Sequence, residues 1–208
     1  MMPLVLEIIA IISYTPASFN GAIITSRMKY HQDVRNYGSG NAGLTNFHRK
    51  YGGKSVLMVI GIDAGKAILA CLAGGLIFEP LGYRMEGMML GAAAVMLGHD
   101  FPVALGFRGG KGILSGWFVA WAVDWRVAVI LITVFALAYG LTRYVSLGSI
   151  LAAASFSISF VIFHHDNLLV MTTGVLLGLL TIWMHRANVV RLVKGQERKT
   201  NLFAKGKQ

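Results

Sequence analysis

The apolar stretch at residues 55–78, SVLMVIGIDAGKAILACLAGGLIF, decides the fold class. It carries only two charged side chains, Asp63 and Lys66, and it is long enough to cross the hydrocarbon core of a bilayer, which takes about 20 helical residues. Comparable apolar runs lie on both sides of it, at residues 4–26, 85–103, 112–123, 126–142, 147–164 and 168–185. The sequence therefore predicts an all-α integral membrane protein, a bundle of seven transmembrane helices in a single domain over residues 1–208, with a flexible tail from about residue 198.

The composition supports this class. The chain has 208 residues, of which 55% are hydrophobic and 13% are charged, and its mean hydropathy is +0.62. A soluble domain of this size has too much surface for so few charges to cover. The net charge of +10 comes from cations grouped between the apolar runs. Membrane topology explains that grouping without nucleic acid, so we expect no nucleic-acid partner.

The positions of Lys and Arg predict the orientation of the chain. With seven spans, one face collects the cations of residues 27–54, 108–111 and 143 and the seven that follow residue 185, whereas the other face receives Arg84 and Arg126. The positive-inside rule then places the N-terminus outside and the C-terminus in the cytoplasm. The run at 112–123 is short for a crossing. Without it the chain would have six spans, with cations on both faces.

Asp63 and Lys66 stand three residues apart inside a span. Charges in a span are costly, so we expect the two to form an ion pair facing the interior of the bundle. The alternative is a Lys66 side chain that reaches the interface by itself. No set of Cys, His or Glu residues has the spacing of a metal site, so we expect no metal and no cofactor.

Four polar motifs fall on the face that collects the cations. The first is YGSGNAGLTNFHRKYG, at residues 37–52. Between and after its glycines stand short polar side chains and a cation, namely Ser39, Asn41, Thr45, Asn46 and Arg49. A helix that begins near Gly43 would place Asn46 and Arg49 side by side, and exposed amides with an Arg form an anion cradle. An ordinary Gly/Asn loop is the alternative.

The second motif is GHDFPVALGFRGGKG, at residues 98–112. Successive glycines let main-chain amides converge on one phosphate, Lys111 adds a positive charge, and the next helix presents its N-terminus. The spacing does not match a Walker A loop. His99 and Pro102 at the end of an apolar run predict a helix that breaks where its backbone lines a cavity. The motif predicts a phosphate-binding loop, with a plain flexible loop as the alternative.

The third and fourth motifs are shorter. In TRYVSLGSI, residues 142–150, Ser146 and Ser149 share one helix face, although small residues also serve close helix packing. In HRANVVRLVKGQE, residues 185–197, His185 and Asn188 are neighbours on one face, and Arg191 lies one step further round. A basic tail on anionic lipid would explain the later lysines but not His185, Asn188 and Glu197.

In this order, the segments GSGNAGLTN, GHDFPVALGFRGGKG and HRANVVRLVKGQE resemble the bacterial acyl-phosphate:glycerol-3-phosphate acyltransferases, the PlsY family. The resemblance covers nearly the whole chain. It implies transfer of a fatty acyl group from acyl phosphate to the 1-hydroxyl of glycerol 3-phosphate, which gives lysophosphatidic acid and inorganic phosphate. It also implies a multi-pass protein of the bacterial inner (plasma) membrane with its active site facing the cytoplasm. The partners would be these two substrates and membrane lipid.

The resemblance also implies site roles, with the Gly109 and Gly110 amides holding the donor phosphate. The residues expected to act in catalysis are Ser39, Lys111, His185 and Asn188. Those expected to bind substrate are Asn41, Thr45, Asn46, Arg49, His99, Arg108, Gly109, Gly110, Gly112, Ser146, Ser149, Arg191 and Glu197. Two departures are visible, because Arg108 stands where the family commonly has Lys, and ILS follows where VAT is common.

The main alternative is a membrane transporter of an organic phosphate. A transporter needs a polar path and a site near the midplane of the bilayer. Apart from Asp63 and Lys66, the apolar runs contain little that would line such a path. The clustering of the polar motifs on one face favours the enzyme.

Overall fold

The computed structural model describes residues 14–200, and over this range the chain is helical and without strands. The α-helices are α2 (Gly21–Tyr30), α3 (Leu44–Lys50), α4 (Ser55–Phe78), α5 (Arg84–Asp100), α6 (Ile113–Val123), α7 (Trp125–Thr142), α8 (Val145–Phe163), α9 (Leu168–Met184) and α10 (Arg186–Val193). Short 3-10 turns lie at Val34–Asn36, Glu79–Leu81 and Val103–Leu105. The predicted all-α class is confirmed for the part of the chain that the structure describes.

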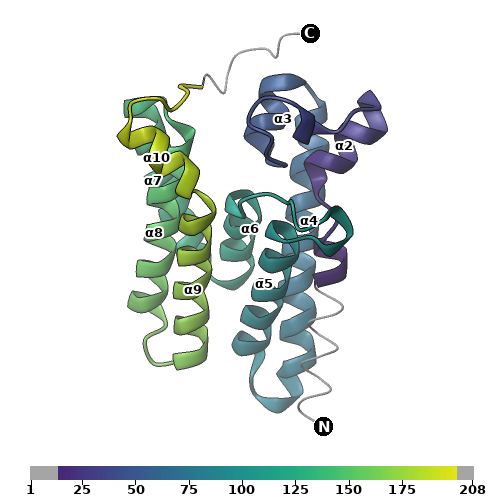
Figure 1. Ribbon diagram of the computed structural model, residues 1–208. Coiled ribbons are helices and arrows are strands. Elements are labelled where there is room, and N and C mark those ends of the chain that lie inside the picture. Colours follow the sequence, from purple (N-terminus) through teal and green to yellow (C-terminus); the bar gives the residue numbers. More distant parts are fainter. Residues whose placement is uncertain (1–13, 201–208) are drawn as a thin grey trace.

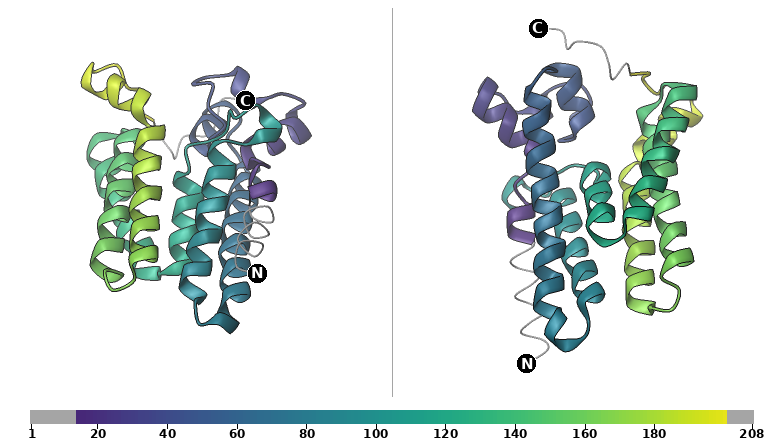
Figure 2. Two further views of the ribbon diagram at one scale, coloured as in Figure 1. Left: turned by 60° about the horizontal axis from the view of Figure 1, so that its bottom comes forward. Right: turned by 180° about the vertical axis from the view of Figure 1, so that it is seen from behind.

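The helices form two groups. Helices α2 to α5 stand on one side, α7 to α10 on the other, and the short α6 lies between them (Figure 1), an arrangement that is also visible from behind (Figure 2). Within the first group α4 and α5 pack closely, because a Cβ at Gly87 would lie only 2.2 Å from the Gly74 carbonyl oxygen. Small residues of this kind let membrane helices approach each other without a hydrophobic driving force.

The outer surface of the bundle is apolar. Large aliphatic side chains such as Leu57, Leu76, Leu137 and Leu176 are each more than 60% exposed. Such a surface is costly in water, whereas hydrocarbon solvates it at no cost. Within residues 14–200, four helices are long and apolar enough to cross a membrane by length and composition, namely α4, α5 (counted through Leu105), α7 and α8. Helices α9 and α10, which are bent by 55° relative to each other, would make a fifth if the pair is one span.

Two expected spans differ from the structure. The run at 112–123 forms a helix of 11 residues, α6, which is shorter than a full crossing needs. The expected span at 4–26 is interrupted at residues 18–20, where the helical backbone of residues 14–17 ends and Asn20 caps a new helix, α2, through the amides of Ala22 and Ile23. The part of this run before residue 14 lies outside the described residues.

All four polar motifs lie at the same end of the bundle. Helix α3, the start of α8 and helix α10 lie at the top of Figure 1 and the loop before α6 lies lower, below α3, whereas the Glu79–Leu81 turn lies at the opposite end. The tail expected to be flexible from about residue 198 is described only as far as Thr200, and the rest of it lies outside the described residues. The Thr200 amide donates to the Arg143 carbonyl over 3.0 Å, and Tyr139 Oη donates to the Thr200 carbonyl over 2.9 Å.

Candidate active site

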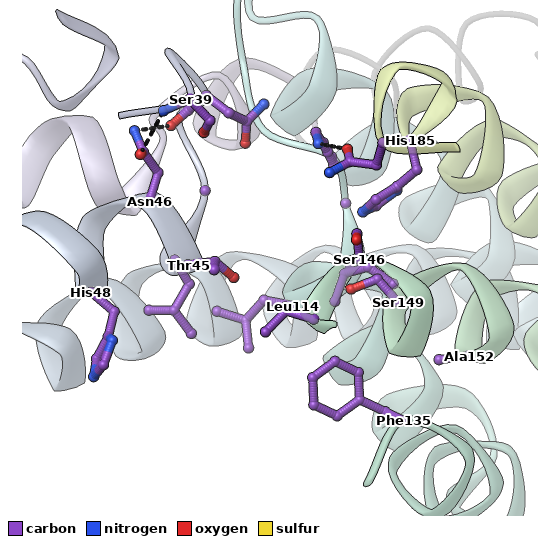
Figure 3. A pocket seen from close by; sticks show the side chains of 18 of the residues that line it. Ser39, Thr45, Asn46, His48, Leu114, Phe135, Ser146, Ser149, Ala152 and His185 are labelled. Atoms are coloured by element: carbon purple, nitrogen blue, oxygen red, sulfur yellow. Dashed lines mark hydrogen bonds between the residues drawn. The ribbon is translucent and has the colours of Figure 1, made fainter. Parts of the chain in front are cut away.

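A cavity of about 600 Å³ lies between the two helix groups at the end that carries the polar motifs (Figure 3). Most of the expected site residues line it, from all four motifs: Ser39, Asn41, Thr45, Asn46, Arg49, His99, Lys111, Gly112, Ser146, Ser149, His185, Asn188, Arg191 and Glu197. Arg108, Gly109 and Gly110 do not line it. Segments more than a hundred residues apart in the sequence therefore meet in one cavity.

The loop at residues 37–43 is built around Asn46. The Asn46 amide nitrogen donates to the carbonyl oxygens of Val34, Tyr37 and Asn41, over 3.1, 2.9 and 3.0 Å, and its Oδ1 accepts from the Ser39 amide over 3.1 Å. The side chain is 3% exposed. Because its polar atoms are engaged with the loop, Asn46 holds Ser39 in place, which differs from the direct substrate contact expected for it.

The glycine loop is held by its own backbone. The amide of Gly109 donates to the Asp100 carbonyl over 3.3 Å, and that of Gly110 donates to the His99 carbonyl over 3.1 Å. These amides are therefore occupied in this structure, contrary to the expectation that they are free to hold a phosphate. The glycines are required instead by close packing, since a Cβ at Gly109 would lie 2.0 Å from the His99 carbonyl oxygen.

Arg35 anchors the glycine loop from outside and was not expected from the sequence. Its Nη1 donates to the carbonyl oxygens of Leu105 and Arg108, over 3.0 and 3.3 Å, while its Nη2 pairs with Asp33 Oδ2 at 2.9 Å. The hydrogen bonds from Arg35 hold the pKa of the Asp33 carboxyl far below its usual range. Arg108 itself is exposed, so its carbonyl oxygen, not its guanidinium, serves the loop here.

Lys111 joins the glycine loop to the C-terminal motif. Its ammonium donates to Asn188 Oδ1, Asn188 Nδ2 donates to Glu197 Oε1 over 3.1 Å, and Arg191 Nε pairs with Glu197 Oε2 at 2.8 Å. Burial, and next the nearby Arg191 charge, lower the pKa of Lys111 to about 8. A cation in such surroundings gains strongly from a bound anion.

His185, Ser146 and Ser149 lie near one another on one side of the cavity (Figure 3). The ring nitrogen His185 Nδ1 lies 2.8 Å from the Thr181 carbonyl oxygen. A carbonyl can only accept, so Nδ1 carries the proton and Nε2 of the neutral ring is an acceptor. Ser146 and Ser149 are both buried, and within residues 14–200 the Ser146 hydroxyl has no hydrogen-bond partner.

Arg49 lies at the edge of the cavity, beside the C-terminal segment. Its Nε donates to Thr200 Oγ1 over 3.1 Å, and its guanidinium also contacts that hydroxyl through Nη2. Burial lowers the pKa of Arg49, which nevertheless remains cationic at any physiological pH. The cavity thus has four lining cations, Arg49 from α3, Lys111 from the glycine loop, Arg191 from α10 and Arg198 from the segment after α10.

One wall of the cavity is apolar, which sequence reasoning did not predict. Helices α6, α7 and α8 supply Leu114, Trp117, Leu131, Ile132, Phe135, Val145 and Ala152. Figure 3 shows Leu114 and Phe135 below the serines. In the sequence these residues belong to apolar stretches typical of any membrane helix. Only their positions around one cavity distinguish them from residues that face lipid.

The expected ion pair between Asp63 and Lys66 is present, with 2.9 Å between Lys66 Nζ and Asp63 Oδ1. Asp63 also lines the cavity, from below the glycine loop. Over the described range, no group of three His, Cys, Asp or Glu side chains lies close enough to hold a metal ion.

A helical membrane bundle that gathers four cations, hydroxyl groups and an imidazole beside an apolar wall defines a class: an integral membrane protein for phosphate-bearing, lipid-like molecules. The comparisons with known proteins identify the family. The family model described as "Glycerol-3-phosphate acyltransferase" matches residues 7–195, and the chain belongs to this family.

Curated relatives and solved structures agree with this assignment. The chain is 36% identical to the glycerol-3-phosphate acyltransferase of Finegoldia magna, over 94% of this chain and 96% of the relative. It is 37% identical to that of Thermoanaerobacter sp. (strain X514), over 91% and 93%. Its structure is similar to a crystal structure of PlsY, described as an integral membrane glycerol 3-phosphate acyltransferase in the glycerol 3-phosphate form, with a TM-score of 0.83, 31% identity and coverage of 96% of this chain and 99% of that one. A lysophosphatidic acid form of PlsY matches with a TM-score of 0.80 and 30% identity, over 95% of this chain and 96% of that one.

Proposed function

We propose that this protein transfers a fatty acyl group from acyl phosphate to the 1-hydroxyl of glycerol 3-phosphate, giving lysophosphatidic acid and inorganic phosphate. Acyl transfer to glycerol 3-phosphate is the activity named for the family. The single observation that carries the choice of substrates is the junction, in one cavity, of a cationic polar half with an apolar wall. The polar half suits two phosphoryl groups, and the wall suits the acyl chain of the donor.

The reaction needs positioning and charge stabilisation more than covalent participation by the protein. Acyl phosphate is a mixed anhydride, so the glycerol hydroxyl oxygen bonds to the acyl carbon as the bond from that carbon to the phosphate oxygen breaks. The phosphate leaves with the bonding electrons. The proton of the hydroxyl goes to His185 Nε2 or to an oxygen of the departing phosphate. The fixed positions of the two substrates and of the cations around them accelerate the acyl transfer.

The places of these residues in the cavity support the following roles. Lys111 and Ser39 contact the donor phosphate and stabilise it as it leaves, with Lys111 held by Asn188. Arg49, Ser149 and His185 hold glycerol 3-phosphate with its hydroxyl near the acyl carbon. Further residues of the polar half are Asn41, Thr45, Gly112, Ser146, Arg191 and Glu197. No cofactor takes part in this scheme.

The proposal includes the topology expected from the sequence: seven spans, an outside N-terminus, a cytoplasmic C-terminus and a bacterial inner membrane. The cations at the cavity end support it, because they include Arg27, Lys29, Lys50 and Lys54 together with Arg143, whereas Arg84 and Arg126 stand at the other end. In this scheme α6 counts as a span although it is short, which a thin or locally deformed bilayer would accommodate.

A donor assay tests the proposal. Purified protein is given glycerol 3-phosphate with acyl phosphate, acyl-CoA or acyl carrier protein, and both lysophosphatidic acid and released phosphate are measured. We expect product with acyl phosphate alone. Lys111→Ala should lose about 10²-fold or more in kcat, as expected when a main stabiliser of developing charge is removed. The matched control is Lys54→Ala, which removes an exposed cation outside the cavity. Activity with acyl-CoA alone would overturn the donor assignment.

A further inference from the structure

A buried charged cluster lies directly beneath the glycine loop. Lys66 Nζ contacts Asp63 Oδ1 at 2.9 Å and His99 Nδ1 at 2.8 Å. The three side chains are 6%, 3% and 5% exposed in the order Lys66, Asp63 and His99. Charged side chains buried inside a membrane protein are costly and usually pair with specific groups. Each contact of this cluster is therefore expected to have a structural or functional role.

Part of the cluster has a structural task. Lys66 Nζ also lies 3.3 Å from the carbonyl oxygens of both Ala17 and Phe19, and Asp63 Oδ1 accepts from the Gly21 amide over 3.1 Å. These backbone groups belong to the break at residues 18–20, where the regular helical bonds are interrupted. The ion pair therefore supplies hydrogen-bond partners to backbone groups at a helix break inside the bundle. This task does not require His99.

The contact with His99 fixes the position of the imidazole proton. A lysine ammonium has donors and no acceptor, so His99 Nδ1 must accept from it. The other groups near Nδ1 are Ser115 Oγ at 3.4 Å and Asp63 Oδ1 at 3.7 Å. With Nδ1 as an acceptor, the ring carries its hydrogen on Nε2.

The Nε2 edge of His99 faces the glycine loop. A Cβ at Gly110 would lie 2.0 Å from Nε2, so the ring packs against the backbone of the loop, and His99 lines the cavity. Among the described residues Nε2 has no hydrogen-bond partner. The neighbouring Gly109 and Gly110 amides are engaged with the backbone. At this point of the loop, the hydrogen-bond donor that remains available to a ligand is therefore the His99 imidazole.

We propose that the Lys66–Asp63 pair holds His99 as the Nε2–H tautomer, so that His99 donates a hydrogen bond to a substrate phosphate oxygen beside Gly110. The ligand part rests on the proposed function. Lys66 and Asp63 are positioning residues in this scheme, acting through His99. The same ion pair would thus serve both the helix break and the site.

The tautomer is measured directly, without substrate. Protein labelled with ¹⁵N-histidine, in detergent micelles, is examined by long-range ¹H–¹⁵N NMR, and the His99 signals are assigned by their loss in His99→Gln. We expect the Nε2–H pattern for His99 in the wild type and a change of pattern in Lys66→Met, with the other histidines unchanged. An Nδ1–H or doubly protonated His99 in the wild type would overturn the proposal, even if Lys66→Met failed to fold.

Steady-state kinetics test the role of His99 as a hydrogen-bond donor. A Gln amide can place an N–H near the position of His Nε2, whereas an Asn amide reaches only the position of Nδ1. We expect His99→Asn and Lys66→Met to lower kcat/KM by about 10- to 100-fold, the effect of one lost hydrogen bond to a charged group. His99→Gln should retain more activity than His99→Asn, and Lys66→Arg should retain more activity than Lys66→Met. Lys54→Met, on the exposed start of α4, is the matched control.

The two proposals fail in different ways. A wild-type protein that shows the Nε2–H tautomer but transfers no acyl group from acyl phosphate would overturn the proposed function and leave the tautomer standing. A protein with full transfer activity in which His99→Asn matches His99→Gln would overturn the donor role of His99 alone.

Discussion

Lys111 illustrates how one residue depends on distant parts of the chain. It follows the glycines of its loop, but its ammonium contacts Asn188 on α10, which Glu197 holds in turn. Burial and the nearby Arg191 lower its pKa to about 8. A less solvated cation binds an anion more strongly, at the cost of losing its proton more readily.

This pKa predicts a pH dependence. A lowered pKa means that Lys111 is charged below about pH 8 and loses its proton above it. Because kcat/KM reports the free enzyme, it should fall as the pH rises through about 8, whereas Lys111→Arg should keep its charge and shift the fall upward. Initial rates with acyl phosphate between pH 6 and 10 measure this. If kcat/KM falls at the same alkaline pH in both proteins, the fall reports the titration of a group other than Lys111.

At the scale of elements, the loop at residues 37–43 has no regular secondary structure and takes its shape from α3. Asn46, on the first turn of that helix, bonds backbone groups at both ends of the loop. A loop of this kind would otherwise leave carbonyl oxygens unsatisfied near the cavity. The position of Ser39 therefore depends on a single amide side chain.

Asn46→Asp tests that dependence. The carboxylate has the size of the amide but cannot donate, so the carbonyl oxygens of Val34, Tyr37 and Asn41 lose their partner, and unfolding of the loop should become easier by about 1–3 kcal/mol for each unsatisfied buried group. We expect faster hydrogen exchange at residues 37–43, with exchange in α8 and α9 unchanged. Asn36→Asp, an exposed neighbour, is the control. Uniformly faster exchange over the whole chain would contradict a local role.

At the scale of the whole molecule, the site is a junction between two helix groups. Helices α3 and α4 and the glycine loop provide one side of the cavity, α7, α8 and α10 provide the other, and α6 lies between them (Figure 1). The cations come from both groups, because Arg49 belongs to α3 and Lys111 to the glycine loop whereas Arg191 belongs to α10, so neither group alone contains the whole polar half. The relative position of the two groups is therefore as important to the site as any one residue.

The orientation of this molecule in the membrane can be tested by labelling. The single native cysteine, Cys71, is buried, so a Cys71→Ala background is suitable for introducing exposed cysteines at Lys29 and Asp166, on opposite ends of the bundle. With the cavity facing the cytoplasm, a membrane-impermeant maleimide should label Asp166→Cys in spheroplasts and Lys29→Cys only after lysis. The reverse pattern would place the cavity outside.

The sequence by itself determined the class of fold and the location of the polar motifs. Helix periods and apolar runs depend on local composition, so α4, α5, α7, α8 and α9 appear close to where the sequence predicts them. Most of the polar residues in these motifs line one cavity. Side-chain chemistry is readable before folding, whereas the substrates were implied by the resemblance of the motifs to a known family.

Only the tertiary structure decided what each of these residues contacts. It shows the break at 18–20, the engagement of the Gly109 and Gly110 amides, and the apolar wall of the cavity, none of which leaves a distinct pattern in the sequence. A polar side chain reads the same whether it faces substrate, as Ser146 can, or holds a loop, as Asn46 does. The physical reason is that such roles depend on partners far away in the chain, and those partners are fixed only when the two helix groups pack together.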